Sequence, residues 1–286
     1  MDVVNSVHFS NHTGFEQGFE GDVLQGDQLR SIMKGLQRNG LLKDVGHLLT
    51  GYIGSASFLE AIMDVIKTLR QQGDNSNEDA NNGNSAVGTK RKLRYVCDPV
   101  LGDVGSGFYV PQELVKLFRE QVIPEADVVT PNQFEAEQLT GMTITSVEDV
   151  KKVCASLHDM GPKLVILTSV LLADVGDKKT ISVFASKRDD GIAQLWRINC
   201  PELPGQYTGT GDLFSALLLG HSALNGENLP SSIEKVMNTM YAAIKKSLEL
   251  TPEIPLDAKQ PRGLMLIQCK SIIENPPMEF KAQLVQ

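Results

Sequence analysis

The sequence lacks the features that mark membrane and secreted proteins. No apolar run approaches the roughly 20 residues that cross a bilayer, and residues 1–5 show neither a basic region nor a long apolar stretch. We therefore expect no secretory signal. Only four cysteines are present, Cys97, Cys154, Cys200 and Cys269, and none forms a Cys-x-x-Cys motif. Reduced thiols in a cytoplasmic protein fit this spacing, whereas a disulfide framework and a zinc site do not.

Basic residues are fewer than acidic residues. The chain has 27 Lys and Arg against 35 Asp and Glu, which gives a net charge of −8 and an isoelectric point near 5.2. Nucleic acids and anionic membranes call for basic surfaces, so neither is expected as a partner. The 286 residues are enough for one large α/β domain or two small ones.

Apolar, β-branched segments alternate with helical patterns along the chain. Repeated strand–helix order predicts right-handed βαβ units and a mostly parallel sheet. A turn at 187–191 is expected to join the last two strands as a hairpin. The predicted strands are 3–7, 45–50, 93–98, 127–130, 164–168, 181–185 and 195–198, and the predicted helices are 26–38, 55–72, 112–121, 132–139, 147–160, 212–223 and 232–250.

Residues 73–92 break this alternation. The segment is polar, rich in Asn and without apolar periodicity. Such a composition cannot bury enough apolar surface to offset the entropy of ordering, so we predict a disordered surface insertion. A second loop is expected at 252–261. We expect a single domain over 1–286, with 73–92 as an insertion within it.

The most informative motif is Thr208-Gly209-Thr210-Gly211-Asp212, directly before an apolar run. The run is typical of a buried helix, and the glycines allow a sharp turn at its start. A helix N-terminus offers free N–H donors and a positive dipole, which together bind anions. The dipole also favours the ionised form of Asp212. This arrangement suits phosphoryl transfer, although an ordinary loop with a capping Asp explains the pentapeptide equally well.

Two carboxylates, Asp98 and Asp103, follow a predicted strand. Ligands of open parallel sheets bind at the carboxyl ends of strands, and paired carboxylates there suit Mg²⁺. An Asp-Pro turn with a glycine at its corner is the alternative, and for Asp98 alone it is favoured.

The segment 130–135 opens a helix after another strand. Thr130 and Gln133 have the spacing of a capping box, and Pro131 fits the first helical position. Helix initiation therefore explains these three residues, but it leaves Asn132 and Glu135 unexplained. These two are three residues apart on one helix face, where they suit phosphate oxygens and hydrated Mg²⁺. A solvated helix start is the alternative.

Each of the first two strands also ends in a hydroxyl residue followed by glycine. Thr13 precedes Gly14, and Thr50 precedes Gly51 and Tyr52. Thr13 has the chemistry to hydrogen-bond a heteroaromatic alcohol, and Tyr52 to stack on its ring. Turn formation and core packing explain the same residues, and the choice stays open.

Together these motifs resemble the pyridoxal kinase family of the ribokinase-like superfamily. The resemblance covers almost the whole chain. It implies an α/β ribokinase-like fold, with a mostly parallel central sheet between helices on both faces in three αβα layers. The Gly-x-Gly-Asp motif is common to the superfamily, whereas the other blocks are more specific. These blocks are 9–15, 49–52, 95–103, 108–111 and 130–137.

The resemblance implies phosphorylation of the 5′-hydroxyl of pyridoxal, pyridoxine or pyridoxamine by ATP, with Mg²⁺ or Zn²⁺ and a stimulating K⁺ or Na⁺. It also implies a cytoplasmic homodimer. Asp212 would be the base, and the preceding loop the anion hole for the γ-phosphate. The other implied residues are Gly209, Thr210 and Gly211 for the anion hole; Asp98, Asn132 and Glu135 for ATP and Mg²⁺; Asp103 and Thr130 for the monovalent cation; Thr168, Ser169 and Tyr109 for the nucleotide; and Thr13 and Tyr52 for the vitamer.

The chain departs from the family pattern at its start. Residues 1–7 resemble the second strand of the family, so the first strand, a turn with a substrate-contacting serine, and the first helix have no counterpart. We expect a shortened isoform or incomplete gene model of an active enzyme, a catalytically poor relative, or a chain that acts through a partner subunit. The functional alternatives are a kinase for hydroxymethylpyrimidine and a non-catalytic protein that binds nucleotide or pairs with an intact subunit.

Overall fold

The computed structural model describes residues 2–75, 92–172, 180–224, 228–256, 258 and 261–286. Within these ranges one sheet of seven strands has the order β13-β10-β9-β8-β7-β4-β3. The first four strands along the chain pair in parallel, and the last three continue the sheet in antiparallel pairs. Their bounds are β3 His47–Thr50, β4 Arg94–Cys97, β7 Val128–Val129, β8 Leu164–Val170, β9 Thr180–Asp189, β10 Ile192–Pro201 and β13 Gln283–Leu284.

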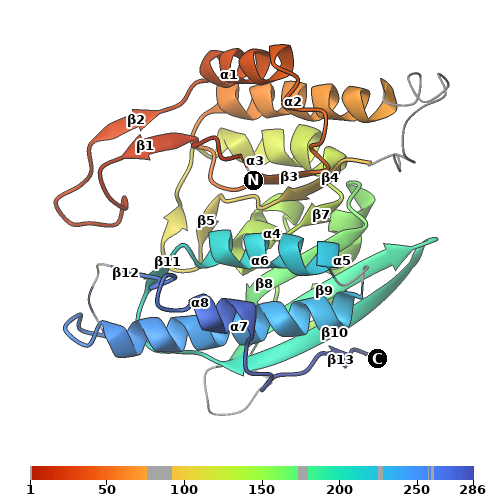
Figure 1. Ribbon diagram of the computed structural model, residues 1–286. Coiled ribbons are helices and arrows are strands. Elements are labelled where there is room, and N and C mark those ends of the chain that lie inside the picture. The colour runs from red at the N-terminus through yellow and green to blue at the C-terminus, as the bar shows by residue number, and fades with distance from the viewer. Residues whose placement is uncertain (1, 76–91, 173–179, 225–227, 257, 259–260) are drawn as a thin grey trace.

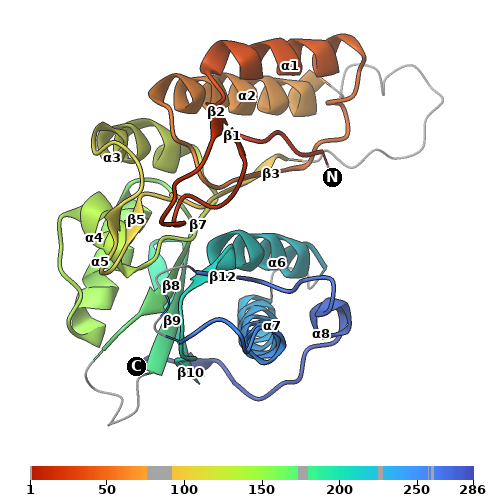
Figure 2. The ribbon, with the colours of Figure 1, turned by 90° about the vertical axis from the view of Figure 1, so that its left-hand side faces the viewer.

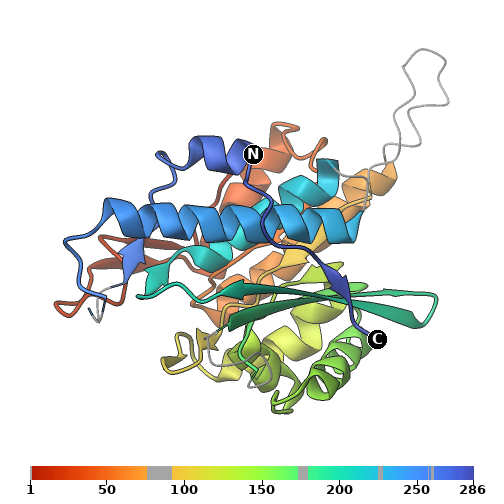
Figure 3. The same cartoon turned by 90° about the horizontal axis from the view of Figure 1, so that it is seen from below.

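Helices cover both faces of this sheet (Figures 1 and 2). Figure 3 shows α7 along one face of β9 and β10, with helices of the other layer on the opposite face. The predicted three-layer α/β fold is confirmed. One layer contains α1 Gly26–Arg38, α2 Ala56–Asn75, α3 Glu113–Leu117, α4 Gln133–Thr140 and α5 Val147–Asp159; the other contains α6 Thr210–Leu224, α7 Leu229–Leu250 and α8 Lys270–Glu274.

The alternation of side chains along a strand explains why the sheet has a core on each face. In β4, Tyr95 and Cys97 belong to one buried cluster, which α2 to α5 cover, whereas Val96 belongs to the other, beneath α6 and α7. Strands buried on both faces read as continuous apolar runs, as β8 does. No helix in the described ranges is long and apolar enough to cross a membrane.

The predicted strand at 3–7 is wrong. The strand is β1, Val7–Phe9, and it pairs with β2, Gly21–Val23, in a separate antiparallel hairpin rather than in the central sheet. Ser6 Oγ donates to the main-chain oxygen of Tyr52 at 2.6 Å and anchors this hairpin beside the strand β3, which forms the sheet's edge. β2 has only three residues, too few for a period-two pattern to be recognised.

Other boundaries also differ from the prediction. The helix expected over 112–121 is divided into α3 and a π-helical turn, Phe118–Val122. The hairpin at 187–191 is confirmed, with positive φ at Asp190 and Gly191. The first three residues of the insertion predicted over 73–92 belong to the helix α2, which ends at Asn75. Residues 76–91 lie outside the described ranges, so the predicted disorder stays a prediction.

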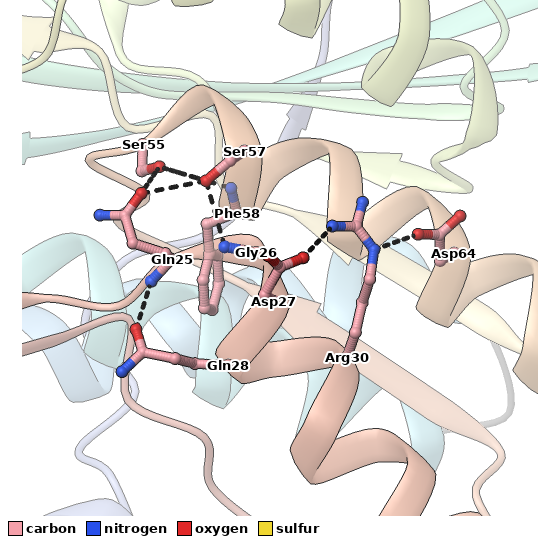
Figure 4. A network of polar contacts seen from close by, with 9 residues as sticks. All are labelled: Gln25, Gly26, Asp27, Gln28, Arg30, Ser55, Ser57, Phe58 and Asp64. Atoms are coloured by element: carbon pink, nitrogen blue, oxygen red, sulfur yellow. Dashed lines mark hydrogen bonds and ion pairs between the residues drawn. The ribbon is translucent and has the colours of Figure 1, made fainter.

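Polar contacts tie the start of α1 to the start of α2 (Figure 4). Ser55 and Ser57 each donate a hydroxyl hydrogen bond of 3.1 Å to Gln25 Oε1. The Gly26 amide donates to Ser57 Oγ at 3.1 Å, and the Gln25 amide donates to Gln28 Oε1 at 2.7 Å. These bonds satisfy first-turn amides of α1 that have no partner within the helix.

We expect Gly26→Ala to lower the free energy of unfolding by about 1–3 kcal/mol, the usual cost of overpacking. A Cβ at position 26 would collide with the main-chain oxygen of Ser57. Gly35→Ala is the matched control, because a Cβ there meets nothing within 4 Å. Alanine is the better helix former by about 1 kcal/mol, so this control is expected to stabilise the protein. Urea denaturation measures both, and equal effects of one sign would contradict the prediction.

Candidate active site

The predicted site residues gather at one edge of the sheet. Asp98 follows β4, Gly51 follows β3, Thr130 follows β7, and Thr168 lies near the end of β8. Because these strands are parallel, their carboxyl ends meet at this edge, where open α/β sheets bind ligands. The N-terminus of α6 lies at the same edge, on the left in Figure 1.

The Gly-x-Gly-Asp motif forms the start of α6, as predicted. Gly209 has φ of +80°, a conformation that glycine adopts without steric cost. The helix begins at Thr210, two residues earlier than expected, and the Leu213 amide already donates to Gly209 O at 3.1 Å. Unpaired amides of the first turn therefore point out of the helix end and can hold an anion.

Asp212 lies against the end of β3. A Cβ on Gly51 would lie 3.2 Å from Asp212 Oδ1, and a Cβ on Gly211 would lie 3.3 Å from Asp98 Oδ2. These two glycines let a loop and a helix approach two carboxylates that are far apart in the sequence. The close approach of Gly51 was not predicted, because no local pattern links it to Asp212.

Asp98 and Glu135 form a buried pair of carboxyl groups. Asp98 is 5% exposed and Glu135 is 3% exposed. Burial, and then the negative charge of Asp212, raise the pKa of Asp98 to about 7. Burial, and then the charge of Asp98, raise the pKa of Glu135 to about 8. Asp98 Oδ2 is buried without a hydrogen-bond partner among the described residues, an arrangement that a cation at this oxygen would relieve.

The capping box of α4 differs from the prediction. Asn132, not Thr130, is the N-cap: the Glu135 amide donates to Asn132 Oδ1, and the Asn132 amide donates to Glu135 Oε2, both at 2.9 Å. The assignment of Thr130 and Gln133 to the box is wrong. The hydroxyls of Thr130 and Ser215 hydrogen-bond at 3.1 Å, and Gln133 Oε1 accepts from the Leu171 amide.

The capping of α4 therefore explains Asn132 and Glu135 after all. Each residue also has a polar atom that takes no part in the cap. The second carboxylate oxygen of Glu135 accepts from the Leu101 amide at 2.9 Å, and Asn132 Nδ2 donates to Gly102 O at 2.7 Å. These bonds fix the loop after Asp98 to the start of α4. Ser215, one turn after Asp212 on α6, is a further residue of this edge that was not predicted.

The pKa of Asp212 shifts in the direction opposite to the one predicted from the helix dipole. Asp212 is accessible to solvent, yet partial burial of its carboxyl group raises its pKa. The dipole argument considered the local helix alone, whereas loss of solvation depends on the β3 end that packs beside it.

The pair Asp98 and Glu135 predicts that stability falls with rising pH. A carboxyl group with a raised folded-state pKa binds more protons when folded, so folding is favoured at low pH. This contribution is present below the unfolded values near 4 and is lost as pH rises through about 7 and 8. Thermal unfolding from pH 5 to 8.5 measures the slope. Asp98→Asn is expected to flatten it, and an unchanged slope in this variant would contradict the assignment.

The remaining nucleotide and cation candidates lie at the rim. Asp103 and Tyr109 are exposed at and just after the small hairpin of β5, Gly102–Asp103, and β6, Gly107–Phe108. Asp103 Oδ1 accepts from the Val104 amide at 2.7 Å. Thr168 and Ser169 are half-buried in β8, and the Thr168 amide donates to Pro131 O. No contact in the described ranges joins Asp103 to Thr130 or Asp98.

Thr13 and Tyr52 approach the site from two sides. Tyr52 is half-buried directly after Gly51, beside Asp212. Thr13 is exposed in the loop between β1 and β2, and a Cβ on the next residue, Gly14, would lie 3.4 Å from Pro261. Pro261 precedes β12, Arg262–Gly263, which pairs with β11, Tyr207–Thr208, immediately before Gly209. The structure thus brings the Thr13 loop toward the anion-binding turn.

Comparisons with known proteins agree with this geometry. Residues 79–255 match the family model described as phosphomethylpyrimidine kinase. Pyridoxal kinase of Arabidopsis thaliana is 40% identical over 99% of this chain and 84% of its own length. A structure of pyridoxal kinase from Leishmania donovani with ADP and pyridoxamine has a TM-score of 0.86 at 26% identity, over 99% of this chain and 88% of that one.

A structure of the enzyme from Plasmodium falciparum with AMP-PNP and PL has a TM-score of 0.79 at 27% identity. It covers 99% of this chain and 88% of that one. The similarity therefore extends across the sheet, the helices of both layers and the edge that carries Asp98 and Asp212. On this identity and coverage, the chain belongs to the pyridoxal kinase family, with its ribokinase-like fold.

Proposed function

We propose that a single ribokinase-like domain transfers the γ-phosphate of ATP to the 5′-hydroxyl of pyridoxal, pyridoxine or pyridoxamine. The observation that carries this proposal is the position of Asp212. It lies at the N-terminus of α6, beside the end of β3 and one residue after Gly211, where a Cβ would lie 3.3 Å from Asp98 Oδ2. A carboxylate beside an anion-binding turn matches a reaction in which an alcohol attacks a phosphate.

In this proposal the first-turn amides at Gly209, Thr210 and Gly211 hold the γ-phosphate and neutralise charge that develops on it. Asp212 orients the 5′-hydroxyl and accepts its proton. A loose phosphoryl-transfer transition state needs little early deprotonation, so positioning contributes most of the rate. The raised pKa of Asp212 makes it a better base than an ordinary exposed carboxylate.

Asp98 and Glu135 fit a divalent cation, because Asp98 Oδ2 is buried and has no hydrogen-bond partner in the part of the chain that the structure describes, and because both pKa values are raised. Among the described residues no three His, Cys, Asp or Glu side chains gather closely enough to hold a metal alone. We therefore propose that the chain supplies one or two carboxylates to Mg²⁺ or Zn²⁺, and nucleotide phosphates and water supply the rest. Bound Mg²⁺ would neutralise the charge of the phosphates.

Other roles rest on the family resemblance. Asn132, Thr168, Ser169 and Tyr109 are proposed to contact ATP, and Thr13 and Tyr52 to contact the vitamer. Asp103 and Thr130 are proposed for K⁺ or Na⁺. Support for this last site is limited to their common edge of the sheet, since the Thr130 hydroxyl is already bonded to Ser215.

We also propose a cytoplasmic homodimer. All four cysteines are buried and free, which suits a reducing compartment. The dimer rests on the family resemblance. Sedimentation at micromolar concentration is expected to give twice the chain mass of 31.2 kDa, and a species of single chain mass would contradict it.

The test is steady-state formation of pyridoxal 5′-phosphate by the purified chain with ATP, Mg²⁺ and K⁺. Turnover that requires ATP, Mg²⁺ and K⁺ supports the proposal. Hydroxymethylpyrimidine competes in a parallel assay, because the matching family model is named for that chemistry. A higher kcat/KM for the pyrimidine would reassign the substrate. ATP binding without turnover would favour the non-catalytic alternative.

A further inference from the structure

A cavity lies at the opposite edge of the sheet from Asp212. Its volume is about 520 Å³, within the range of small-molecule sites. The parallel strands β3, β4, β7 and β8 begin here, and the antiparallel strand β9 ends here. In Figure 1 this edge lies on the right, where α6 ends and α7 begins. Its lining includes Lys92, Arg94, Lys163 and Lys187.

The lining is cationic in a protein with a net charge of −8. Four Lys and Arg side chains face two carboxylates, Asp127 and Asp189. Lys187 Nζ lies 2.9 Å from Asp189 Oδ2, so this pair is internally neutral. Asp127 Oδ2 accepts a hydrogen bond from the Tyr95 amide at 2.8 Å. One oxygen of this carboxylate therefore interacts with the sheet backbone.

Among the described residues, the other three cations of the lining have no carboxylate partner within ion-pair distance. In the described part of the chain no ion pair or side-chain hydrogen bond involves Lys92, Arg94 or Lys163. Main-chain bonds hold them at one edge: the Arg94 amide donates to Gly46 O, and Lys163 O accepts from the Arg188 amide, both at 2.9 Å. Like charges held together repel one another, and an anion between them would relieve this repulsion.

Helix dipoles do not determine the sign of the electrostatic potential in the cavity. The C-terminal part of α6 contributes Ser222 to the lining, and the first residues of α7 contribute Leu229 and Ser232. A negative and a positive helix end therefore meet here, each equivalent to about half a charge. They offset one another, so the side chains determine the potential.

We propose that this cavity binds a phosphorylated small molecule with at least two negative charges, held by Lys92, Arg94 and Lys163. The site is separate from the proposed kinase site, because the two lie at opposite ends of the same parallel strands. The cavity volume of about 520 Å³ is larger than a single phosphate ion needs. The size therefore favours a pyrophosphate or a nucleotide over a single small anion.

The test is calorimetric titration of inorganic pyrophosphate into the full chain, into a cavity variant and into a control variant; binding at the kinase site is common to all three, so the difference between them reports the cavity. Lys92→Gln/Lys163→Gln removes two exposed cavity charges, and Lys34→Gln/Lys43→Gln is the control, because both are exposed outside the cavity. We expect the cavity variant to bind at least about tenfold more weakly, which corresponds to about 1.4 kcal/mol, because two charged contacts to the anion are lost. The control is expected to bind like the unaltered chain.

Added salt is expected to weaken binding, because the lysines are open to solvent and screened. Should the double variant fail to fold, Arg94→Gln gives the same comparison. AMP in place of pyrophosphate separates the possible ligands: tighter binding indicates a nucleotide, and weaker binding another phosphorylated molecule. Absence of pyrophosphate binding, or equal affinities in cavity and control variants, would overturn the proposal. The comparison does not require kinase activity, so it fails or succeeds independently of the proposed function.

Discussion

Asp212→Ala is expected to lower kcat by about 10²–10⁴-fold, the usual contribution of general acid–base catalysis. The carboxylate lies at the N-terminus of α6 against Gly51, where the attacking hydroxyl would meet the γ-phosphate. Its removal takes away both the acceptor of the proton and the group that orients the alcohol. The anion-binding amides are main-chain groups and remain, so ATP binding is expected to change little.

Steady-state kinetics and equilibrium titration with ATP measure the two effects separately. Asp212→Asn keeps the size of the side chain and tests the charge alone, and it is expected to lose nearly as much kcat. Asp44→Ala is the matched control, because Asp44 is exposed in the loop before β3. A kcat within about threefold of the unaltered enzyme would exclude Asp212 as base, since general base catalysis contributes far more.

Glu135→Gln is expected to reduce kcat/KM for MgATP by about 10–100-fold, comparable to the loss of an orienting group around a metal. This variant separates the capping role of Glu135, which the structure shows, from its proposed role in holding Mg²⁺. Glutamine also completes a capping box, so the bond from the Asn132 amide can persist. The charge beside Asp98 is lost, and with it the attraction for Mg²⁺.

Thermal unfolding and a Mg²⁺ titration of activity complete this comparison. Glu135→Gln is expected to need more Mg²⁺ for half-maximal rate. Its single amide oxygen can keep the bond from the Asn132 amide but not also the one from the Leu101 amide, so we expect it to cost about 1 kcal/mol of unfolding free energy. Glu135→Ala removes the cap as well, and we expect it to cost about 1 kcal/mol of unfolding free energy in addition. If Glu135→Gln had the unaltered kcat/KM and Mg²⁺ dependence, Glu135 would serve helix initiation alone.

Local patterns account for the parts of the fold that were predicted well. The bounds of α1 match the prediction, α5 ends one residue earlier than predicted, and α6 begins two residues earlier and ends one residue later. Amphipathic periodicity and turn residues act within a few positions, so they are visible in one sequence. The order of strands and helices likewise predicted a mostly parallel sheet. Its antiparallel extension by β13 involves residues far apart in the chain, which no local pattern indicates.

The same limit explains the errors. The segment 3–7 has strand composition, but the strand that forms is β1, Val7–Phe9, and it pairs with β2 rather than with the central sheet. Which strands pair is decided by the tertiary structure. Thr130 and Gln133 have capping-box spacing, yet so do Asn132 and Glu135. The spacing alone does not distinguish two overlapping boxes, because both place a suitable acceptor three residues before a polar side chain.

The class of fold, the family and the residue types of the candidate site can be read from the chain alone, since motifs such as Gly209–Asp212 are contiguous. Which groups meet at the site depends on how the chain folds. The tertiary structure placed Gly51 against Asp212 and buried Asp98 beside Glu135, which raises the pKa values of these carboxyl groups. It also gathered Lys92, Arg94 and Lys163 around one cavity. The physical reason is that burial and charge–charge interaction depend on distances in space, which the separation along the chain does not contain.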